Sequence, residues 1–227
     1  MASRPSAVAF DVVETLMPLE PLAARFERAG LPRVALQEWF TRLLLYGMGL
    51  SAAGDYVPFP DAAAEALRAV SGYRLAGQDV EYVLAGFSQL PAHPDAEPAM
   101  RRLADAGVRV CCLTNGSAAT TAAFLARTGL ETYVERVISV ADVGSWKPPA
   151  RVYHHAADVL GLSPDHVALV AVHAWDCHGA KRAGLVTGWA SRLEGRYGSL
   201  FAPADVTGAD LTEVADGLLA LPVRNQI

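Results

Sequence analysis

The sequence has no apolar run of membrane-spanning length and no excess of basic charge. Its 19 Lys and Arg residues are outnumbered by 24 Asp and Glu residues, which gives a net charge of −5. The densest basic spots, Arg101-Arg102 and Lys181-Arg182, are too short to form a nucleic-acid-binding surface. The opening stretch Met1–Pro5 contains no apolar signal-peptide segment. We therefore expect a cytoplasmic protein with no nucleic-acid or membrane partner.

Cysteine is also scarce. The three residues, Cys111, Cys112 and Cys177, are odd in number and form no Cys-x-x-Cys pair. This pattern supports neither a disulfide framework nor a zinc site. Cys111 and Cys112 lie together in an apolar run, so we expect them to be reduced core residues.

Apolar segments suited to a large core are plentiful, since hydrophobic residues make up 52% of the chain. The run Ala7–Phe10 is typical of a strand that is buried on both faces, and Asp11 follows it directly. Open α/β sheets bind their ligands at the carboxyl ends of strands, where this carboxylate would lie. The alternative is an ordinary Asp in a turn.

Apolar spacing divides the rest of the chain into two regions. From residue 17 to about residue 90 the period is helical, and no strand pattern occurs. From residue 96 onward, buried strands alternate with helical stretches, as in the βαβ units of a parallel sheet. We predict an α/β core, a doubly wound parallel sheet made of residues 1–16 and 96–227, with an all-helical cap of residues 17–95 inserted into it. The predicted core strands cover residues 108–113, 134–140, 167–172 and 186–190, and the predicted core helices cover residues 99–106, 118–128, 150–160, 178–183 and 211–219.

Polar residues follow four of the predicted strands: Asp11 with Thr15, the segment Thr114–Ser117, Lys147, and Asp176. Each has an ordinary explanation as a turn residue, a helix cap or a solvated loop lysine. Because the strands are parallel, however, these residues should converge on one edge of the sheet. Their convergence favours a small-molecule site in the cleft between core and cap.

Four motifs resemble the haloacid dehalogenase superfamily of hydrolases in both order and spacing. The resemblance covers nearly the whole chain, and the third and fourth motifs look most like the L-2-haloacid dehalogenase branch. The motifs are Phe10-Asp11 with Thr15-Leu16, Leu113–Ser117, Lys147–Tyr153, and Ala174-Trp175-Asp176.

The resemblance implies hydrolysis through a covalent ester on the enzyme. Asp11 would attack the substrate, Lys147 would keep Asp11 ionised, and Thr15 would orient it. Asp176 would hold Lys147 and help to position the water that cleaves the ester. The residues expected to bind a small anionic substrate or brace the site around it are Thr114, Asn115, Gly116, His173, Phe40, Tyr153 and Trp175.

Two reactions are open within this resemblance. Phosphatases of the superfamily carry an acid two residues after the nucleophile and bind Mg²⁺ with carboxylates of the first and fourth motifs. Here the acid position holds Val13, and Ala171 and Val172 stand where a further metal ligand is expected. Dehalogenation needs no acid, because halide leaves unaided. We therefore expect a haloacid dehalogenase-like enzyme without metal or cofactor, acting on a 2-haloacid or an analogue; Mg²⁺ belongs to the phosphatase alternative.

The leaving-group pocket departs from the dehalogenase branch. That branch has a halide-binding Arg just after a cap Trp, and alignment on Trp39 puts Phe40 there, while Arg42 would face elsewhere on the helix. The Gly three residues after the nucleophile is replaced by Glu14, which should point away from the site unless the loop re-aims it. An Asn of the fourth motif is replaced by His173. This His could donate a proton, provide the positive partner of the halide, or be structural.

Two other functions stay open. One is a phosphatase with Glu14 or His173 as substitute acid, and the other is a weakly catalytic binding protein that kept the fold. The resemblance also implies a homodimer that pairs through a cap helix. Finally, we expect Lys147→Ala to abolish turnover with little loss of stability, because a lysine in a cleft is not part of the core.

Overall fold

The computed structural model describes residues 2–223, and within them the chain builds one parallel sheet of six strands. The strand order is β3-β2-β1-β4-β5-β6, so the connections run outward in both directions from β1. Such a reversal creates the switch point at which open α/β sheets bind their ligands. The strands are β1 (Ala7–Phe10), β2 (Arg109–Thr114), β3 (Val134–Ser139), β4 (Val167–Ala171), β5 (Val186–Ala190) and β6 (Val206–Gly208).

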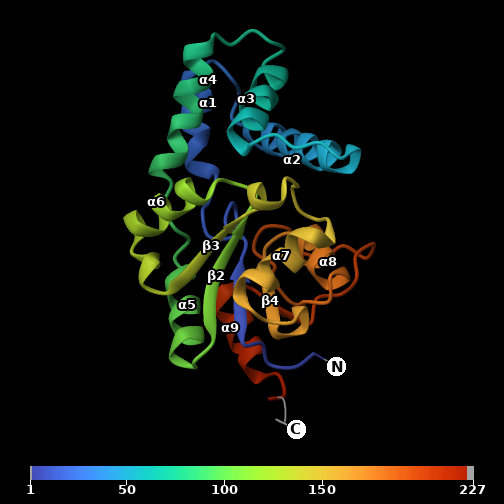
Figure 1. Ribbon diagram of the computed structural model, residues 1–227. Coiled ribbons are helices and arrows are strands. Elements are labelled where there is room, and N and C mark those ends of the chain that lie inside the picture. Colours follow the sequence, from blue (N-terminus) through green and yellow to red (C-terminus); the bar gives the residue numbers. More distant parts are fainter. Residues whose placement is uncertain (1, 224–227) are drawn as a thin grey trace.

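Strand β1 lies at the centre of the sheet, and both of its faces are buried. Val8 and Phe10 pack into one core cluster, while Ala7 and Ala9 pack into the other, because successive side chains of a strand alternate. Helices on both faces of the sheet confirm the predicted doubly wound architecture (Figure 1). The first cluster is covered by α5 (Ala96–Asp105), α6 (Ala118–Thr128) and α9 (Leu211–Ala220), and the second by α7 (Ala150–Leu160) and α8 (Ala174–Arg182).

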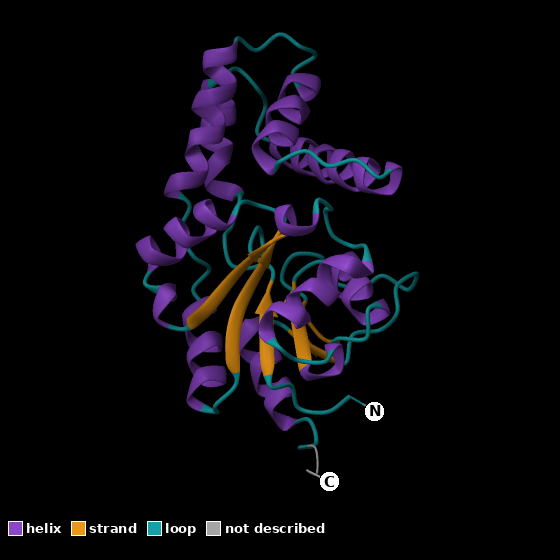
Figure 2. Cartoon of the chain, in the orientation of Figure 1, coloured by secondary structure: helices purple, strands orange, loops and turns teal. Residues whose placement is uncertain are grey.

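A group of helices stands beyond the carboxyl ends of the strands (Figure 2). Trp39 is buried at its centre, where its ring lies 5.6 Å from that of Phe26 and its indole N–H donates to the Ala63 carbonyl at 2.9 Å. Within residues 2–223, no helix is both long and apolar enough to cross a membrane. The helices that stand beyond the ends of the strands, which we call the cap helices, are α1 (Ala23–Arg28), α2 (Ala35–Ala53), α3 (Phe59–Val70) and α4 (Gly77–Leu84).

Trp146 joins the cap helices to the sheet region. Its ring stacks on Phe59 at 5.7 Å, and its indole N–H donates to the Val57 carbonyl at 3.0 Å. Gly47 of α2 faces the same ring so closely that a Cβ there would lie 2.2 Å from it, and only glycine permits this approach. Because Trp146 precedes Lys147, the cap is anchored directly beside a predicted site residue.

The core strands and helices lie close to the predicted ranges, with one correction. Helix α8 begins at Ala174, whereas the sequence pattern predicted a start at residue 178. Its first turn is stabilised by Glu194, whose carboxylate accepts the Ala174 backbone N–H at 3.1 Å. This helix-capping contact comes from a loop that is distant in the sequence, so the local pattern contains no signal for it.

Candidate active site

Asp11 follows β1 at the switch point of the sheet, and its side chain is almost fully buried. Its Oδ2 accepts a hydrogen bond from the Thr15 hydroxyl at 2.6 Å. The Thr15 oxygen in turn accepts the backbone N–H of Val172, at the end of β4, at 3.2 Å. Thr15 therefore orients the carboxylate and ties the loop after β1 to the neighbouring strand.

Lys147 brings the two predicted acids together. Its Nζ lies 3.0 Å from Asp11 Oδ1 and 2.8 Å from Asp176 Oδ2, and its backbone N–H donates to Asn115 Oδ1 at 3.0 Å. The lysine is 0% exposed. The expectation that a cleft lysine lies outside the core is therefore wrong, and with it the reason for expecting Lys147→Ala to spare stability. Lys147 directly follows Trp146, the residue that contacts the cap helices.

Tyr153 and Asp176 form the inner wall of the site. The Tyr153 hydroxyl donates to Asp176 Oδ1 at 2.6 Å, so both carboxylate oxygens of Asp176 have a donor. Gly179, one turn along α8, makes room for this contact, because a Cβ there would lie 2.6 Å from the Tyr153 hydroxyl oxygen. Tyr153 thus fixes the position of Asp176 through a direct hydrogen bond. The resemblance implied only that Tyr153 would brace the site.

The surroundings drive the pKa values of the two acids apart. Burial raises the pKa of Asp11, but Lys147 and His173 outweigh burial and hold it well below its usual value. Burial also raises the pKa of Asp176, and here Lys147 offsets only part of the effect. Burial lowers the pKa of Lys147, yet the two carboxylates outweigh this and raise it. Asp11 is therefore the ionised acid, while Asp176 is better suited to take up a proton.

Glu14 and His173 form a second charged pair on the other side of Asp11. Glu14 Oε2 lies 2.8 Å from His173 Nε2, and His173 Nδ1 lies 3.6 Å from Asp11 Oδ2. Burial alone would lower the pKa of His173, but the two carboxylates raise it to about 10, so the ring is an imidazolium at neutral pH. Glu14 adopts a φ of 67°, a left-handed conformation that is uncommon outside glycine. This conformation re-aims the Glu14 side chain into the site.

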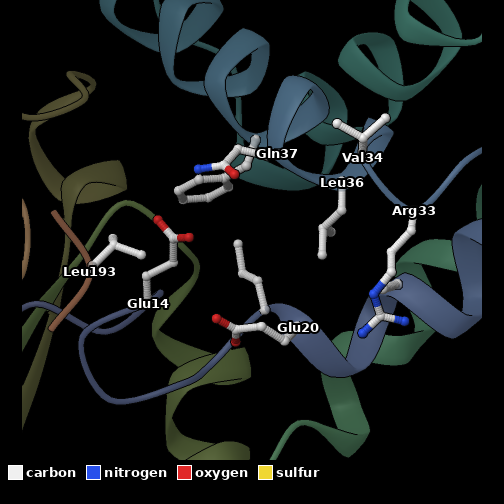
Figure 3. A pocket seen from close by; sticks show the side chains of 10 residues that line it. Glu14, Glu20, Arg33, Val34, Leu36, Gln37 and Leu193 are labelled. Carbon is white, nitrogen blue, oxygen red and sulfur yellow. The ribbon is translucent and has the colours of Figure 1, made fainter.

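Two aromatic rings enclose His173. Phe40 of α2 is buried with its ring 6.3 Å from the imidazole, and Trp175 is half-buried with its ring at 5.4 Å. Phe40 and Glu14 also line a cavity of about 470 Å³ between α1, α2 and the loop after β1. Figure 3 shows Glu14 reaching into this cavity from one side and Gln37 from the cap. Arg42 faces away and pairs with Glu38 at 3.5 Å near solvent.

The segment after β2 has its own internal contacts. Thr114 Oγ1 accepts the Gly116 backbone N–H at 2.9 Å, and Ser117 caps α6 by accepting the Thr120 N–H at 3.0 Å. Thr114 and Gly116 line a second, mainly apolar cavity of about 280 Å³, together with Val12, Val13, Phe59 and Phe87. The amino end of α6 and the loop after β1, with Val12 and Val13, therefore line the same cavity.

Arg192, which the sequence gave no reason to single out, secures the loop that carries Glu14. Its guanidinium donates to the Thr15 carbonyl and, at 3.5 Å, to the Glu14 carbonyl. It also pairs with Asp95 Oδ2 at 2.6 Å, which accepts the Leu211 backbone N–H as well. Arg192 lies in the loop after β5, and no local motif marks it.

The positive charges beside Asp11 come from Lys147 and His173. The Lys147 ammonium lies between Asp11 and Asp176, where a bridging cation would otherwise be held. In the part of the chain that the structure describes, no group of three or more His, Cys, Asp and Glu side chains is arranged to hold a metal ion.

The chain is similar to known hydrolases in sequence and in fold. Residues 5–184 match a family of hydrolases described as haloacid dehalogenase-like. The chain is 30% identical to (S)-2-haloacid dehalogenase 4A of Burkholderia cepacia, over 80% of each chain. It is 27% identical to an (S)-2-haloacid dehalogenase of Pseudomonas fluorescens, over 92% of this chain and 95% of the relative. A crystal structure of a dehalogenase with an intermediate complex superimposes with a TM-score of 0.87 at 26% identity, covering 99% of this chain and 100% of that one.

Proposed function

This chain belongs to the haloacid dehalogenase-like hydrolases, and on that premise we propose that it cleaves the carbon–halogen bond of small 2-haloacids through an ester on Asp11. The resemblance drawn from the four motifs is thereby confirmed at the level of the family. The observation that carries the proposal is the buried Lys147 ammonium shared between Asp11 and Asp176. This one ammonium keeps Asp11 ionised as the nucleophile and holds Asp176 beside it as a second acid.

In the first step, a carboxylate oxygen of Asp11 attacks the halogen-bearing carbon of the substrate. A carbon–oxygen bond forms, the carbon–halogen bond breaks, and its electron pair leaves with the halide. Lys147 and Thr15 keep the carboxylate ionised and oriented for this displacement. No proton transfer is required, which agrees with Val13 at the position of the phosphatase acid.

In the second step, water attacks the carboxyl carbon of the Asp11 ester. Asp176 takes up the proton of this water, because burial makes it the more basic of the two acids. The bond between the Asp11 carboxyl carbon and the substrate oxygen then breaks, the substrate oxygen takes the proton, and a 2-hydroxyacid is released. The water oxygen remains on Asp11, whose carboxyl group releases the second proton of the water to solvent and returns to the ionised form that Lys147 favours.

The substrate carboxylate is best placed at the amino end of α6. Backbone N–H groups at the start of a helix favour an anion, and Gly116 and Thr114 line the cavity there. The apolar side of the same cavity, with Val13, Phe59 and Phe87, suits the carbon chain of the substrate.

Halide release tests the proposal against its alternatives. We expect release from (S)-2-chloropropionate in the presence of a chelator, loss of that activity in Asp11→Asn, and full activity in Asp158→Asn, which alters an exposed acid on α7. Phosphate release from p-nitrophenyl phosphate only with Mg²⁺ would replace the dehalogenase proposal with the phosphatase. Binding of haloacids without turnover would favour the binding protein. A cytoplasmic location and a homodimer stay predictions, and sedimentation velocity checks the latter.

A further inference from the structure

His173 carries a buried polar atom that has no hydrogen-bond partner in the described structure. This atom is Nδ1, and it lies on the side of the ring that faces Asp11, at 3.6 Å from Oδ2. Nε2, on the other side of the ring, is held by Glu14 at 2.8 Å. The His173 side chain is only 7% exposed, so water does not provide a ready substitute. Its ion pair with Asp11 is longer than a hydrogen bond, so an acceptor on a bound molecule at hydrogen-bond distance would satisfy this donor better.

The groups around the imidazole keep its proton in place. Glu14 approaches from the loop after β1 and Asp11 from the end of the strand, while Phe40 and Trp175 cover the ring without offering charge. Glu194 lies next to it along the chain, on the Ala174 backbone N–H. Among residues 2–223, Lys147 and His173 are the two cationic side chains that pair with Asp11.

We propose that Glu14 positions His173 so that its Nδ1–H is donated to the departing halide, and that this contact adapts the site to fluoride as leaving group. The inference rests on the proposed function. His173 is the group that touches the reacting atoms, and Glu14 acts through it.

The attack of Asp11 on the substrate carbon frees the Nδ1–H of His173 to bind the halide. As Asp11 becomes an ester, its negative charge is consumed, and the attraction that holds the Nδ1–H toward Oδ2 is lost. The carbon–halogen bond breaks at the same time, and its electron pair appears on the halide. The proton stays on His173, which Glu14 continues to hold, and the new hydrogen bond stabilises the developing negative charge.

Fluoride gains most from such a contact. It is the smallest and most basic halide and the strongest hydrogen-bond acceptor of the series, and the carbon–fluorine bond is the hardest to break. Charge-assisted hydrogen bonds are the stronger ones, so an imidazolium donor favours fluoride more than chloride or bromide. Phe40 beside the ring provides an apolar wall that keeps water from competing for the donor.

A leaving-group series tests this inference. Turnover of 2-fluoro-, 2-chloro- and 2-bromopropionate is measured for the wild type, His173→Gln and Glu14→Gln, with Glu38→Gln as a matched control on the solvent side of α2. We expect His173→Gln to lose roughly 10²–10³-fold on the fluoro substrate and less than about 10-fold on the bromo substrate. The quantity compared is the ratio of turnover on the fluoro substrate to turnover on the bromo substrate. Glu14→Gln should lower this ratio as His173→Gln does, and Glu38→Gln should leave it unchanged.

The ratio separates the proposed contact from a structural role. Equal losses on all three substrates, or a wild type that releases bromide but no fluoride, would overturn the inference while leaving the proposed function intact. If no substrate of the series releases halide from the wild type, the proposed function fails first. NMR of the imidazole carbons provides a second readout: His173 should be protonated at about pH 8. Glu14→Gln should lower its pKa, and an unchanged pKa would count against Glu14 as the positioning residue.

Discussion

Replacing Lys147 with alanine should both abolish turnover and destabilise the fold. The lysine is 0% exposed and makes ion pairs at 3.0 Å with Asp11 and at 2.8 Å with Asp176, both of which are buried. Removing one partner from a buried ion pair typically costs about 3–5 kcal/mol, because the remaining charge is left uncompensated. Two like charges remain here, so we expect a loss at or above the upper end of that range. This is a large part of the roughly 5–15 kcal/mol by which most domains are stable.

Urea unfolding followed by circular dichroism measures this cost, and its pH dependence identifies the cause. Without the ammonium, burial raises the pKa of Asp11 and Asp176 above their unfolded values, so the penalty should shrink as pH falls from about 7 to about 5. Lys181→Ala is the matched control: its pair with Asp205 is partly exposed, and we expect a loss of about 0–1 kcal/mol. Lys147→Met retains most of the side-chain volume and separates charge from cavity formation if the alanine variant does not fold. A loss below about 1 kcal/mol at neutral pH would refute the reasoning.

Two further predictions concern His173 and Gly179. Although burial opposes it, the carboxylates of Asp11 and Glu14 raise the pKa of His173 from 6.5 to about 10, so the stability it contributes is fully present below pH 6.5 and is lost as pH rises through about 10. The free energy of unfolding, measured from pH 6.5 to about pH 10, should fall more for the wild type than for His173→Gln. An equal fall in the two proteins would contradict the raised pKa of His173. Gly179→Ala should cost about 1–3 kcal/mol, because its Cβ would lie 2.6 Å from the Tyr153 hydroxyl oxygen. Thermal unfolding checks this, and Tyr153→Phe should recover only part of the loss, because the added Cβ would also lie 2.6 Å from the Pro148 side chain.

Much of the fold follows from local patterns. The double burial of Ala7–Phe10, the alternation of strands and helices from residue 96, and the helical period before it predict the sheet and the order of its elements. The start of α8 could not be predicted in this way, because Glu194, which stabilises its first turn, lies in another loop. Propensity describes a segment by itself, whereas this helix end depends on a tertiary contact.

The site was predictable where topology alone brings residues together. Asp11, Lys147 and Asp176 follow strands of one parallel sheet, and their convergence needs no knowledge of side-chain conformation. The pairing of Glu14 with His173 could not be predicted from the sequence, because it depends on a left-handed backbone at Glu14. That conformation lies in a loop held by Arg192, which is remote in sequence.

The burial of Lys147 was mispredicted for a related reason. Its neighbours Pro148 and Pro149 are typical of an exposed loop, and the sequence does not show that Trp146 packs under the cap. A lysine between two buried carboxylates is a core ion pair as well as part of the active site.

Oxygen labelling tests the central claim, an ester on Asp11, most directly. A single turnover of (S)-2-chloropropionate is run in oxygen-18 water with enzyme in excess, and the peptide that contains Asp11 is examined by tandem mass spectrometry. The ester route predicts heavy oxygen in the Asp11 carboxylate and unlabelled hydroxyacid, because water attacks the carboxyl carbon of the enzyme. Heavy oxygen in the product with none in Asp11 would mean that water attacks the substrate directly, and would contradict the account.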